Sequence, residues 1–266
     1  NMKHKKWLIT LSIILPIIII IGWLVIRDRS AATSISRIKI NINTADTNKI
    51  IDSTYVLDLI YQVTPRVIGV MIEDFPLDKV YQTIKKSNYV ENVFCNIKLD
   101  GTLKIDVWAR CPLLHIITND GYECIIDTSG FIMPVPKKYK LYIPVAYGNI
   151  NTKVQIGSKL KNIKSYTYES KDFTELDKLY YLAKNIKNDE VAKLLFWDIY
   201  VENQKSFYLY PIVGNQYIRL GDVDQIDDKL ENISIFYNNI QHISDISNFV
   251  GFDLRVPPQV IAIKQL

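Results

Sequence analysis

The segment 8–26 carries no charged side chain over nineteen consecutive positions. A helix of about 20 apolar residues is long enough to cross the ~30 Å hydrocarbon core of a bilayer. Trp7 and Trp23 lie near the two ends of the segment, where indole side chains favour the membrane interface. We therefore expect one transmembrane helix at 8–26 after a short tail at 1–7, with everything after residue 30 on one side of the membrane.

A cleaved signal peptide is the alternative, because residues 30–32 (Ser-Ala-Ala) resemble a cleavage site. The apolar run is longer than the core of about 7–15 residues that is usual in signal peptides, which favours a retained anchor. Three lysines before the segment favour a cytoplasmic N-terminus, whereas Arg27 and Arg29 after it weaken the asymmetry. Residue pattern alone therefore leaves the orientation open.

Most of the formal net charge of +4 comes from the N-terminal tail. Of 32 basic residues, three are lysines at positions 3, 5 and 6, which leaves 29 against 28 acidic residues. A nucleic-acid-binding protein needs a cationic face that displaces counterions from phosphates. The nearly neutral body argues against that class of protein.

Residues 35–110 have the pattern of a small α+β module. Two alternating apolar runs, Val93–Leu99 and Leu103–Val107, flank Asp100-Gly101, which is typical of a hairpin with a type I′ turn and positive φ at both turn residues. The remaining expected elements are a strand at 35–42, a helix from Asp52 or Ser53 to Ile60, and a helix from Pro76 to Lys86.

Residues 111–266 predict a second, larger α+β domain, with a mostly antiparallel sheet and two helices on one side. A capping box of Asp172 and Glu175 predicts the start of the first helix, and the second begins near Asp224. The expected strands are 113–118, 122–126, 131–133, 193–202, 206–212, 216–220, 249–256 and 259–264.

The sequence holds no recognisable catalytic or metal-binding motif. The three histidines are isolated from one another and from cysteine pairs, so no metal site is expected. Asp127-Thr128-Ser129-Gly130 departs from the Asp-Thr-Gly of aspartic proteases by one serine, and it has the composition of a hairpin turn. Three cysteines make no disulfide framework, although a Cys111–Cys124 pair stays open.

The order of these features resembles the FtsQ/DivIB family of bacterial division proteins. Arg110 and Pro112 stand where the family has Arg-x-Pro, and Asp127 to Gly130 resembles its D-x-x-G hairpin. The stretches that carry the resemblance cover nearly the whole chain in the family's order: 84–116, 125–136, 143–150 (IPVAYGNI), 217–237 (YIRLGDVDQIDDKLENISIFY) and 252–260 (FDLRVPPQV).

The resemblance implies a POTRA domain at 35–110 and the family's β domain at 111–266. It also implies a scaffold without catalytic residues, cofactor or small-molecule substrate. The protein would be anchored once in the inner membrane, with its N-terminus in the cytoplasm and its bulk in the periplasm at the division septum. The implied partners are small coiled-coil membrane proteins like FtsB and FtsL, and other divisome components, which together govern septal peptidoglycan synthesis.

The final apolar run, 260–263, would pair with 252–256 and leave its other edge open to a partner strand. The resemblance points to the same region for FtsB binding. The candidate partner-binding residues are Phe252, Leu254, Arg255, Gln259, Val260, Ile261, Ala262, Ile263 and Lys264. The alternatives are an internal closing strand for this run, and for the whole chain another POTRA-containing polypeptide-binding or translocation module, or an anchored enzyme acting on the cell wall.

Overall fold

The computed structural model describes residues 16–17, 19–20, 33–45, 47–161, 173–240 and 246–264. The predicted tail at 1–7 lies outside these residues, as does all of the predicted anchor except residues 16, 17, 19 and 20, which are helical. Among the described residues, no helix combines the length and the apolar character that a membrane crossing requires.

The chain separates into two compact units. The first unit comprises Ser53–Lys85 and Val93–Val107 with the residues before Asn43, and the second comprises Asn43–Asp52, Lys86–Asn92 and Trp108–Leu266. The predicted domain boundary at 110/111 therefore lies close to the last division between the units, but two short earlier segments group with the second unit.

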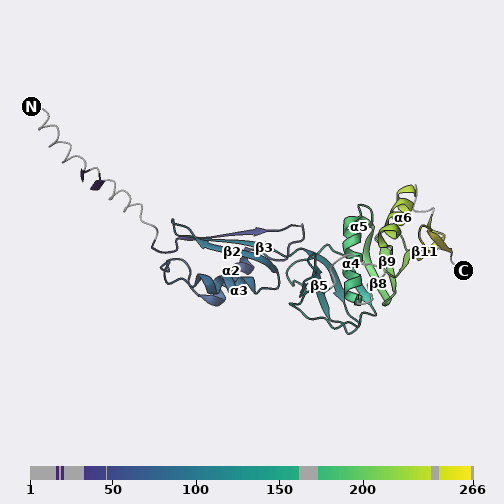
Figure 1. Ribbon diagram of the computed structural model, residues 1–266, viewed down its shortest axis with the longest axis horizontal. Coiled ribbons are helices and arrows are strands. Elements are labelled where there is room, and N and C mark those ends of the chain that lie inside the picture. The colour runs from purple at the N-terminus through teal and green to yellow at the C-terminus, as the bar shows by residue number, and fades with distance from the viewer. Residues whose placement is uncertain are drawn as a thin grey trace, which may run out of the picture. The chain divides into compact units, whose positions relative to one another are not determined.

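The first unit contains two helices and all but the strand ends of a three-stranded sheet (Figure 1). The strand order is β1-β3-β2. The elements are β1 (Arg37–Asn43), α2 (Ser53–Val63), α3 (Leu77–Lys85), β2 (Val90–Ile97) and β3 (Thr102–Ala109).

Alternation along β3 explains the core of the first unit. Side chains of a strand point alternately to the two faces of its sheet, so Leu103, Ile105 and Val107 share one face, and all three are fully buried. The buried helix residues are spaced by four, as one face of a helix requires: Val56 and Ile60 in α2, and Val80 and Ile84 in α3.

The turn between β2 and β3 differs from the type I′ prediction. Gly101 has φ +77°, but Asp100 is not among the residues with positive φ. The N–H of Gly101 donates to the carbonyl of Lys98 (2.9 Å), and the N–H of Lys98 donates to the carbonyl of Thr102 (2.9 Å). Leu99 and Asp100 are therefore the central residues of a turn and both have negative φ. Gly101, which follows them, is the one residue of this connection in the left-handed conformation.

The second unit contains a nine-stranded mixed sheet in the order β12-β11-β10-β9-β8-β7-β4-β5-β6. Three of its pairings are parallel, namely β4 with β7, β7 with β8, and β10 with β11. The strands are β4 (Pro112–Ile117), β5 (Glu123–Asp127), β6 (Ile132–Met133), β7 (Val145–Gly148), β8 (Phe196–Asn203), β9 (Ser206–Pro211), β10 (Tyr217–Gly221), β11 (Phe249–Asp253) and β12 (Ile261–Lys264).

Helices α4 (Glu175–Asn188) and α6 (Ile226–Asn239) lie over one face of this sheet (Figure 1). The predicted apolar stripe of α4 is confirmed as buried in the core of the unit: Leu176, Leu179, Tyr180, Ala183 and Ile186. The capping box is formed by Thr174 and Asp177, so its prediction at Asp172 and Glu175 is wrong. Both pairs have the required spacing, and the chain uses the one nearer the apolar stripe.

The strand predicted at 193–202 begins only at Phe196. Ala192–Leu195 form a short helix, α5, because the Asp189 carboxylate accepts hydrogen bonds from the N–H groups of Val191 (2.9 Å) and Ala192 (2.7 Å). These bonds satisfy donors at the start of a helical turn and favour it over an extended conformation.

Two buried lysines connect the loop after β10 to both helices. Lys178 Nζ on α4 donates to both carboxylate oxygens of Asp222, at 2.7 and 2.8 Å, and to the carbonyl of Gln204 (2.9 Å). Lys229 on α6, 1% exposed, donates to the carbonyl of Asp222 (2.8 Å) and to the Asp224 carboxylate (3.2 Å). This cluster satisfies charges that would otherwise be costly to bury.

All three cysteines are free, so Cys111 and Cys124 do not pair. The register of β4 and β5 places Cys124 opposite Ile116, while Cys111 precedes β4. Burial raises the pKa of the Cys124 thiol to about 12, as expected for a cysteine that packs as a small apolar side chain.

Candidate partner-binding site

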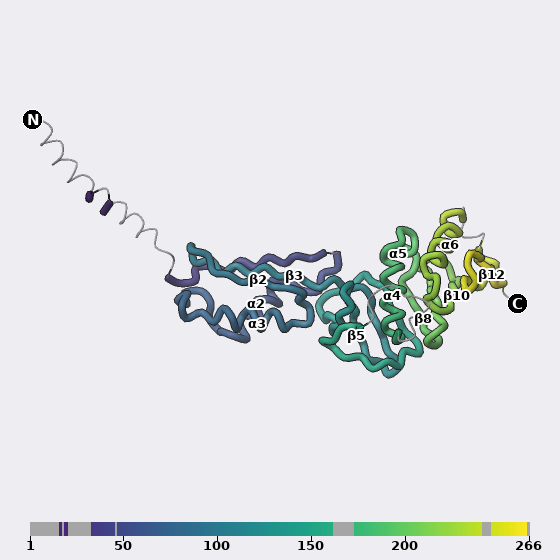
Figure 2. Tube along the Cα trace, viewed as in Figure 1, coloured from purple at the N-terminus to yellow at the C-terminus, as the bar shows by residue number. Residues whose placement is uncertain are grey.

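Strand β12 forms one edge of the nine-stranded sheet (Figure 2). It pairs antiparallel with β11, with Asp253 opposite Ile261, Phe252 opposite Ala262, and Gly251 opposite Ile263. The predicted pairing of the final apolar run with the preceding strand is thus confirmed. An edge strand presents N–H and C=O groups that can pair with a further strand.

The opposite edge of the same sheet is closed by the chain itself. The N–H of Ile132 in β6 donates to the carbonyl of Ser158 (2.9 Å), and the N–H of Gly157 donates to the carbonyl of Ile132 (2.8 Å). A further bond runs from the N–H of Leu160 to the carbonyl of Gly130 (2.8 Å). No such segment pairs with the outer side of β12 within the part of the chain that the structure describes.

The predicted partner-binding residues divide into an exposed and a buried group. Ile261 is 48% exposed. Arg255, Gln259, Ala262 and Lys264 are also exposed, and Val260 and Ile263 are half-buried. Phe252 and Leu254, by contrast, lie in the core of the unit. Phe252 and Leu254 can hold β11 in the sheet through their core contacts, whereas the exposed residues can contact a second protein.

A charged cluster fixes the end of β11. Arg255 donates to the Asp253 carboxylate from Nε (3.0 Å) and Nη2 (2.7 Å), and Arg219 Nη1 lies 3.9 Å from the same carboxylate. Burial alone would raise the pKa of Asp253, but the bonds from Arg255 outweigh it and hold the pKa below its ordinary value. The two guanidinium groups thus share one carboxylate and leave a basic surface beside β12.

A row of tyrosines runs across β7, β8, β9 and β10 on the sheet face opposite the helices. Ring centroids are 5.7 Å apart for Tyr147 and Tyr200, 6.2 Å for Tyr200 and Tyr208, and 5.8 Å for Tyr208 and Tyr217. The ring of Tyr217 lies across β11 at Gly251, where a Cβ atom would lie 2.9 Å from the ring. Aromatic pairs of this kind contribute about 0.5–1.5 kcal/mol each beyond their burial.

Directly paired residues of neighbouring strands share a face, so Ile261 and Ile263 lie on the tyrosine side of the sheet. Sequence reasoning missed this row. Tyrosines do alternate with core residues in β9 and β10, but their alignment depends on the strand order. The tyrosine row therefore extends to Gly251 on β11, the residue that pairs with Ile263 of the edge strand.

Among the residues that the structure describes, no group of three or more histidine, cysteine, aspartate or glutamate side chains could hold a metal ion. Two of the three histidines, His4 and His242, lie outside those residues. The third, His115, has its Nε2 2.9 Å from the Glu123 carboxylate on the neighbouring strand.

No curated protein sequence matches the chain closely enough to count as a relative. The family model described as "FtsQ/DivIB, C-terminal related" matches residues 111–263. That match covers the nine-stranded sheet, both of its long helices and all but the last residue of the β12 edge. Because the match extends over more than half of the 266 residues, the chain belongs to the FtsQ/DivIB C-terminal related family of cell-division proteins.

Proposed function

We propose that the chain is a non-catalytic, membrane-anchored scaffold of the bacterial division machinery, and that β12 binds a strand of an FtsB-like partner. Membership of the FtsQ/DivIB family supports the role in division. The observation that carries the docking proposal is the contrast between the two sheet edges. The β6 edge is closed by main-chain bonds to residues 157–160, and the β12 edge has no such cover in the described residues.

Addition of a partner strand would explain why the exposed edge strand β12 is apolar. Natural proteins usually protect edge strands with charges, prolines or a covering segment. Here Ile261 is 48% exposed, and Lys264 is the one charged side chain of the four-residue strand. A partner strand would gain main-chain bonds from β12, and its alternate side chains would contact Ile261 and Ile263 on one face and Ala262 on the other.

The remaining predicted residues have supporting roles in this proposal. Gln259 and Val260 precede the strand and would contact the end of the partner segment. Phe252 and Leu254 would hold β11 in place from the core, where both are buried. Arg255, whose side chain is 55% exposed, would favour an acidic residue on the partner.

The rest of the proposed architecture follows the family. Residues 1–7 would form a cytoplasmic tail, residues 8–26 the inner-membrane anchor, and residues 35–110 a POTRA domain. The bulk of the chain would then lie in the periplasm at the septum, with FtsB-like and FtsL-like coiled-coil proteins as partners. Two observations would support this: mass spectrometry of the membrane-extracted protein should recover the segment 8–26, and a fluorescent fusion should form a band at midcell.

Proline substitutions along β12 test the docking proposal. Successive N–H groups of a strand point to opposite sides, so one of Ile261 and Ala262 donates toward β11 and the other toward the open edge. Both Ile261→Pro and Ala262→Pro are made in the full chain, which is co-expressed with a tagged FtsB-like protein. The substitution at the outward N–H should abolish capture while circular dichroism stays unchanged, because it removes an unpaired donor and its ring obstructs the incoming strand.

A matched pair of side-chain variants completes the test. Ile261→Arg places a charge on the edge, and Ile235→Arg places the same charge on α6, at an isoleucine that is 51% exposed. Capture should fall for the first variant and stay unchanged for the second. Capture at wild-type strength by both folded proline variants would exclude β12 as the docking edge.

A further inference from the structure

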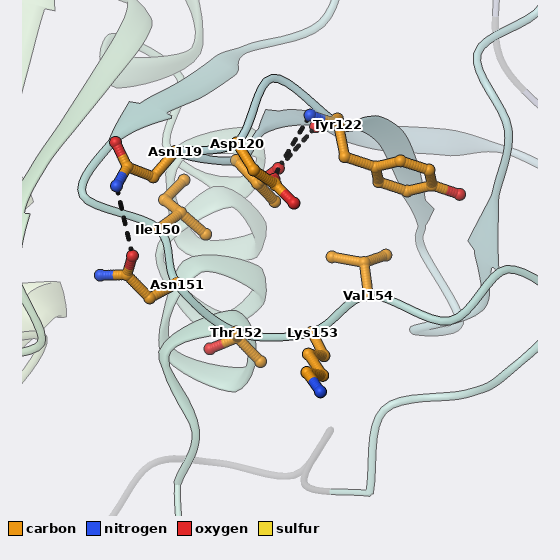
Figure 3. Close-up of a pocket in the computed structure, with 9 residues that line it drawn as sticks. Asn119, Asp120, Tyr122, Ile150, Asn151, Thr152, Lys153 and Val154 are labelled. Atoms are coloured by element: carbon orange, nitrogen blue, oxygen red, sulfur yellow. Dashed lines mark hydrogen bonds between the residues drawn. The ribbon is translucent and has the colours of Figure 1, made fainter.

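A polar groove lies at the carboxyl ends of the parallel strands β4, β7 and β8, in the second unit and away from the β12 edge. Its first pocket, about 480 Å³ in volume, lies between the turn 118–122 and the segment 150–154 (Figure 3). A second pocket of about 390 Å³ shares Asn151 and Thr152 with the first and extends to residues 202–204. Both volumes are in the range of small-molecule sites.

Hydrogen bonds stabilise the two walls of the first pocket. In the turn, the Thr118 hydroxyl accepts a hydrogen bond from the N–H of Tyr122 (3.0 Å) and donates one to the Asp120 carboxylate. In the facing segment, the buried Glu175 carboxylate accepts bonds from the N–H of Asn151 (3.1 Å) and the hydroxyl of Thr152 (3.2 Å). A site whose walls are fixed in advance loses little entropy when it binds.

Side-chain amides join the walls at one end of the pocket. Asn119 Nδ2 donates to Asn151 Oδ1 (3.4 Å), as Figure 3 shows, and Asn151 Nδ2 donates to the carbonyl of Asn149 (3.2 Å). Each amide group has two donors and an oxygen with two acceptor positions, so these bonds use only part of its capacity. Both asparagines are exposed and can therefore offer a donor and an acceptor side by side to a ligand.

Apolar groups stand beside the amides. Val154 lies across the pocket from Tyr122, whose side chain is 44% exposed (Figure 3). The charges do not favour an anion, because Asp120 lines the first pocket with Lys153, and Glu175 and Glu202 line the second. The hydrogen bond from Thr118 holds the pKa of Asp120 below its ordinary value, so this carboxylate is an acceptor at neutral pH.

We propose that this groove binds a neutral oligosaccharide that carries acetamido groups. The acetamido N–H and C=O match the acceptor and donor of the asparagine amides, and its methyl group matches Val154 and Tyr122. Sugar hydroxyls would donate to Asp120 and to the polar residues of the second pocket. A peptide fits less well, because the walls are a turn and a loop and offer no strand edge for main-chain pairing. The proposal is independent of the function assigned to β12.

The test is calorimetric titration of the full chain in a detergent without a sugar headgroup. The probes are the hexamer of N-acetylglucosamine, cellohexaose with the same linkage and no acetamido groups, peptide-free glycan strands from bacterial cell wall, and a Ser-Ala hexapeptide. The N-acetylglucosamine hexamer should bind saturably, and cellohexaose at least about tenfold more weakly, which corresponds to about 1.4 kcal/mol. Every second sugar of the peptide-free wall strands carries a lactyl carboxylate, so these strands should bind more weakly than the neutral hexamer. Tighter binding of the wall strands would contradict a neutral ligand.

Matched variants locate the binding. Asn151→Ala and Tyr122→Ala should each weaken binding of the hexamer by about tenfold, because each removes a main contact. Their controls are Asn215→Ala and Tyr61→Ala, exposed residues of the same types outside the groove, which should stay within about twofold. The proposal is overturned if the hexamer gives no saturable heat, if cellohexaose binds equally well, if only the peptide binds, or if controls and groove variants lose affinity alike while folded.

Discussion

Asp127→Ala should lower the thermal midpoint of the second unit by about 10 °C. Asp127 follows the D-x-x-G pattern, and its carboxylate organises the β5–β6 hairpin. Oδ1 accepts bonds from the N–H and hydroxyl of Ser129 and from the N–H of Phe131, each at 2.8 Å. Oδ2 accepts from Arg110 Nη1 at 2.9 Å, and the Arg110 guanidinium lies 3.5 Å from the centroid of the Phe131 ring.

The magnitude follows from the burial of this pair. The side chains of Asp127 and Arg110 are only 2% and 14% exposed. Removing one partner of a buried ion pair costs about 3–5 kcal/mol, since the other charge stays buried without compensation. In a domain of about 150–250 residues, 1 kcal/mol shifts the midpoint by about 2–4 °C. Asp127→Asn retains a neutral acceptor for the turn, so we expect about half of the loss.

The assay is thermal unfolding of the full chain, followed by the near-ultraviolet signal of its tyrosines. Asp198→Ala is the control, because Asp198 is an exposed aspartate on β8, and such changes stay within about 0.5 kcal/mol. Adding Arg110→Met to Asp127→Asn should recover part of the lost stability, since no unpaired charge then remains. Equal midpoints for Asp127→Ala and Asp198→Ala would refute the reasoning.

Three further predictions each concern a single residue. Gly101→Val should destabilise the first unit by about 1–3 kcal/mol, because a β-branched residue is strained at φ +77°; an unchanged denaturation midpoint would reject this. Asp222→Ala should cost about 3–5 kcal/mol because it removes the carboxylate that neutralises the charge of Lys178, and Lys178→Met in the same chain should restore much of it. The depressed pKa of Asp253 means that its ion pair with Arg255 stabilises the fold above the ordinary pKa of 3.8 and is lost as pH falls further. Asp253→Asn should therefore flatten the acid limb of a plot of midpoint against pH below about 4, and an unaltered limb would contradict the assignment.

Periodicity predicted the elements whose burial depends on local spacing. The buried stripe of α4 follows from apolar residues that recur once per helical turn. The buried face of β3 follows from apolar residues at every second position. The strand pair β11–β12 was predicted for the same reason, from two apolar runs separated by Pro257-Pro258.

Contacts between distant segments could not be predicted in this way. Strand β7 is four residues long and was recognised only as part of a family-like stretch, yet it joins β4 to β8 by two parallel pairings. The tyrosine row and the polar groove both depend on the position of β7 between β4 and β8. Phe252 and Leu254 were included among the partner-binding residues as part of the terminal region, and the sequence alone did not show that both are buried in the core.

Hydrogen exchange along residues 259–264 tests the central proposal most directly. The full chain is compared with and without its FtsB-like partner, with residue-level resolution. If a partner strand adds to β12, amides at alternate positions of Ile261–Lys264 should become protected, while Ile132 on β6, already bonded to Ser158, should not change. Protection elsewhere on the second unit, with no change along β12, would contradict strand addition at this edge.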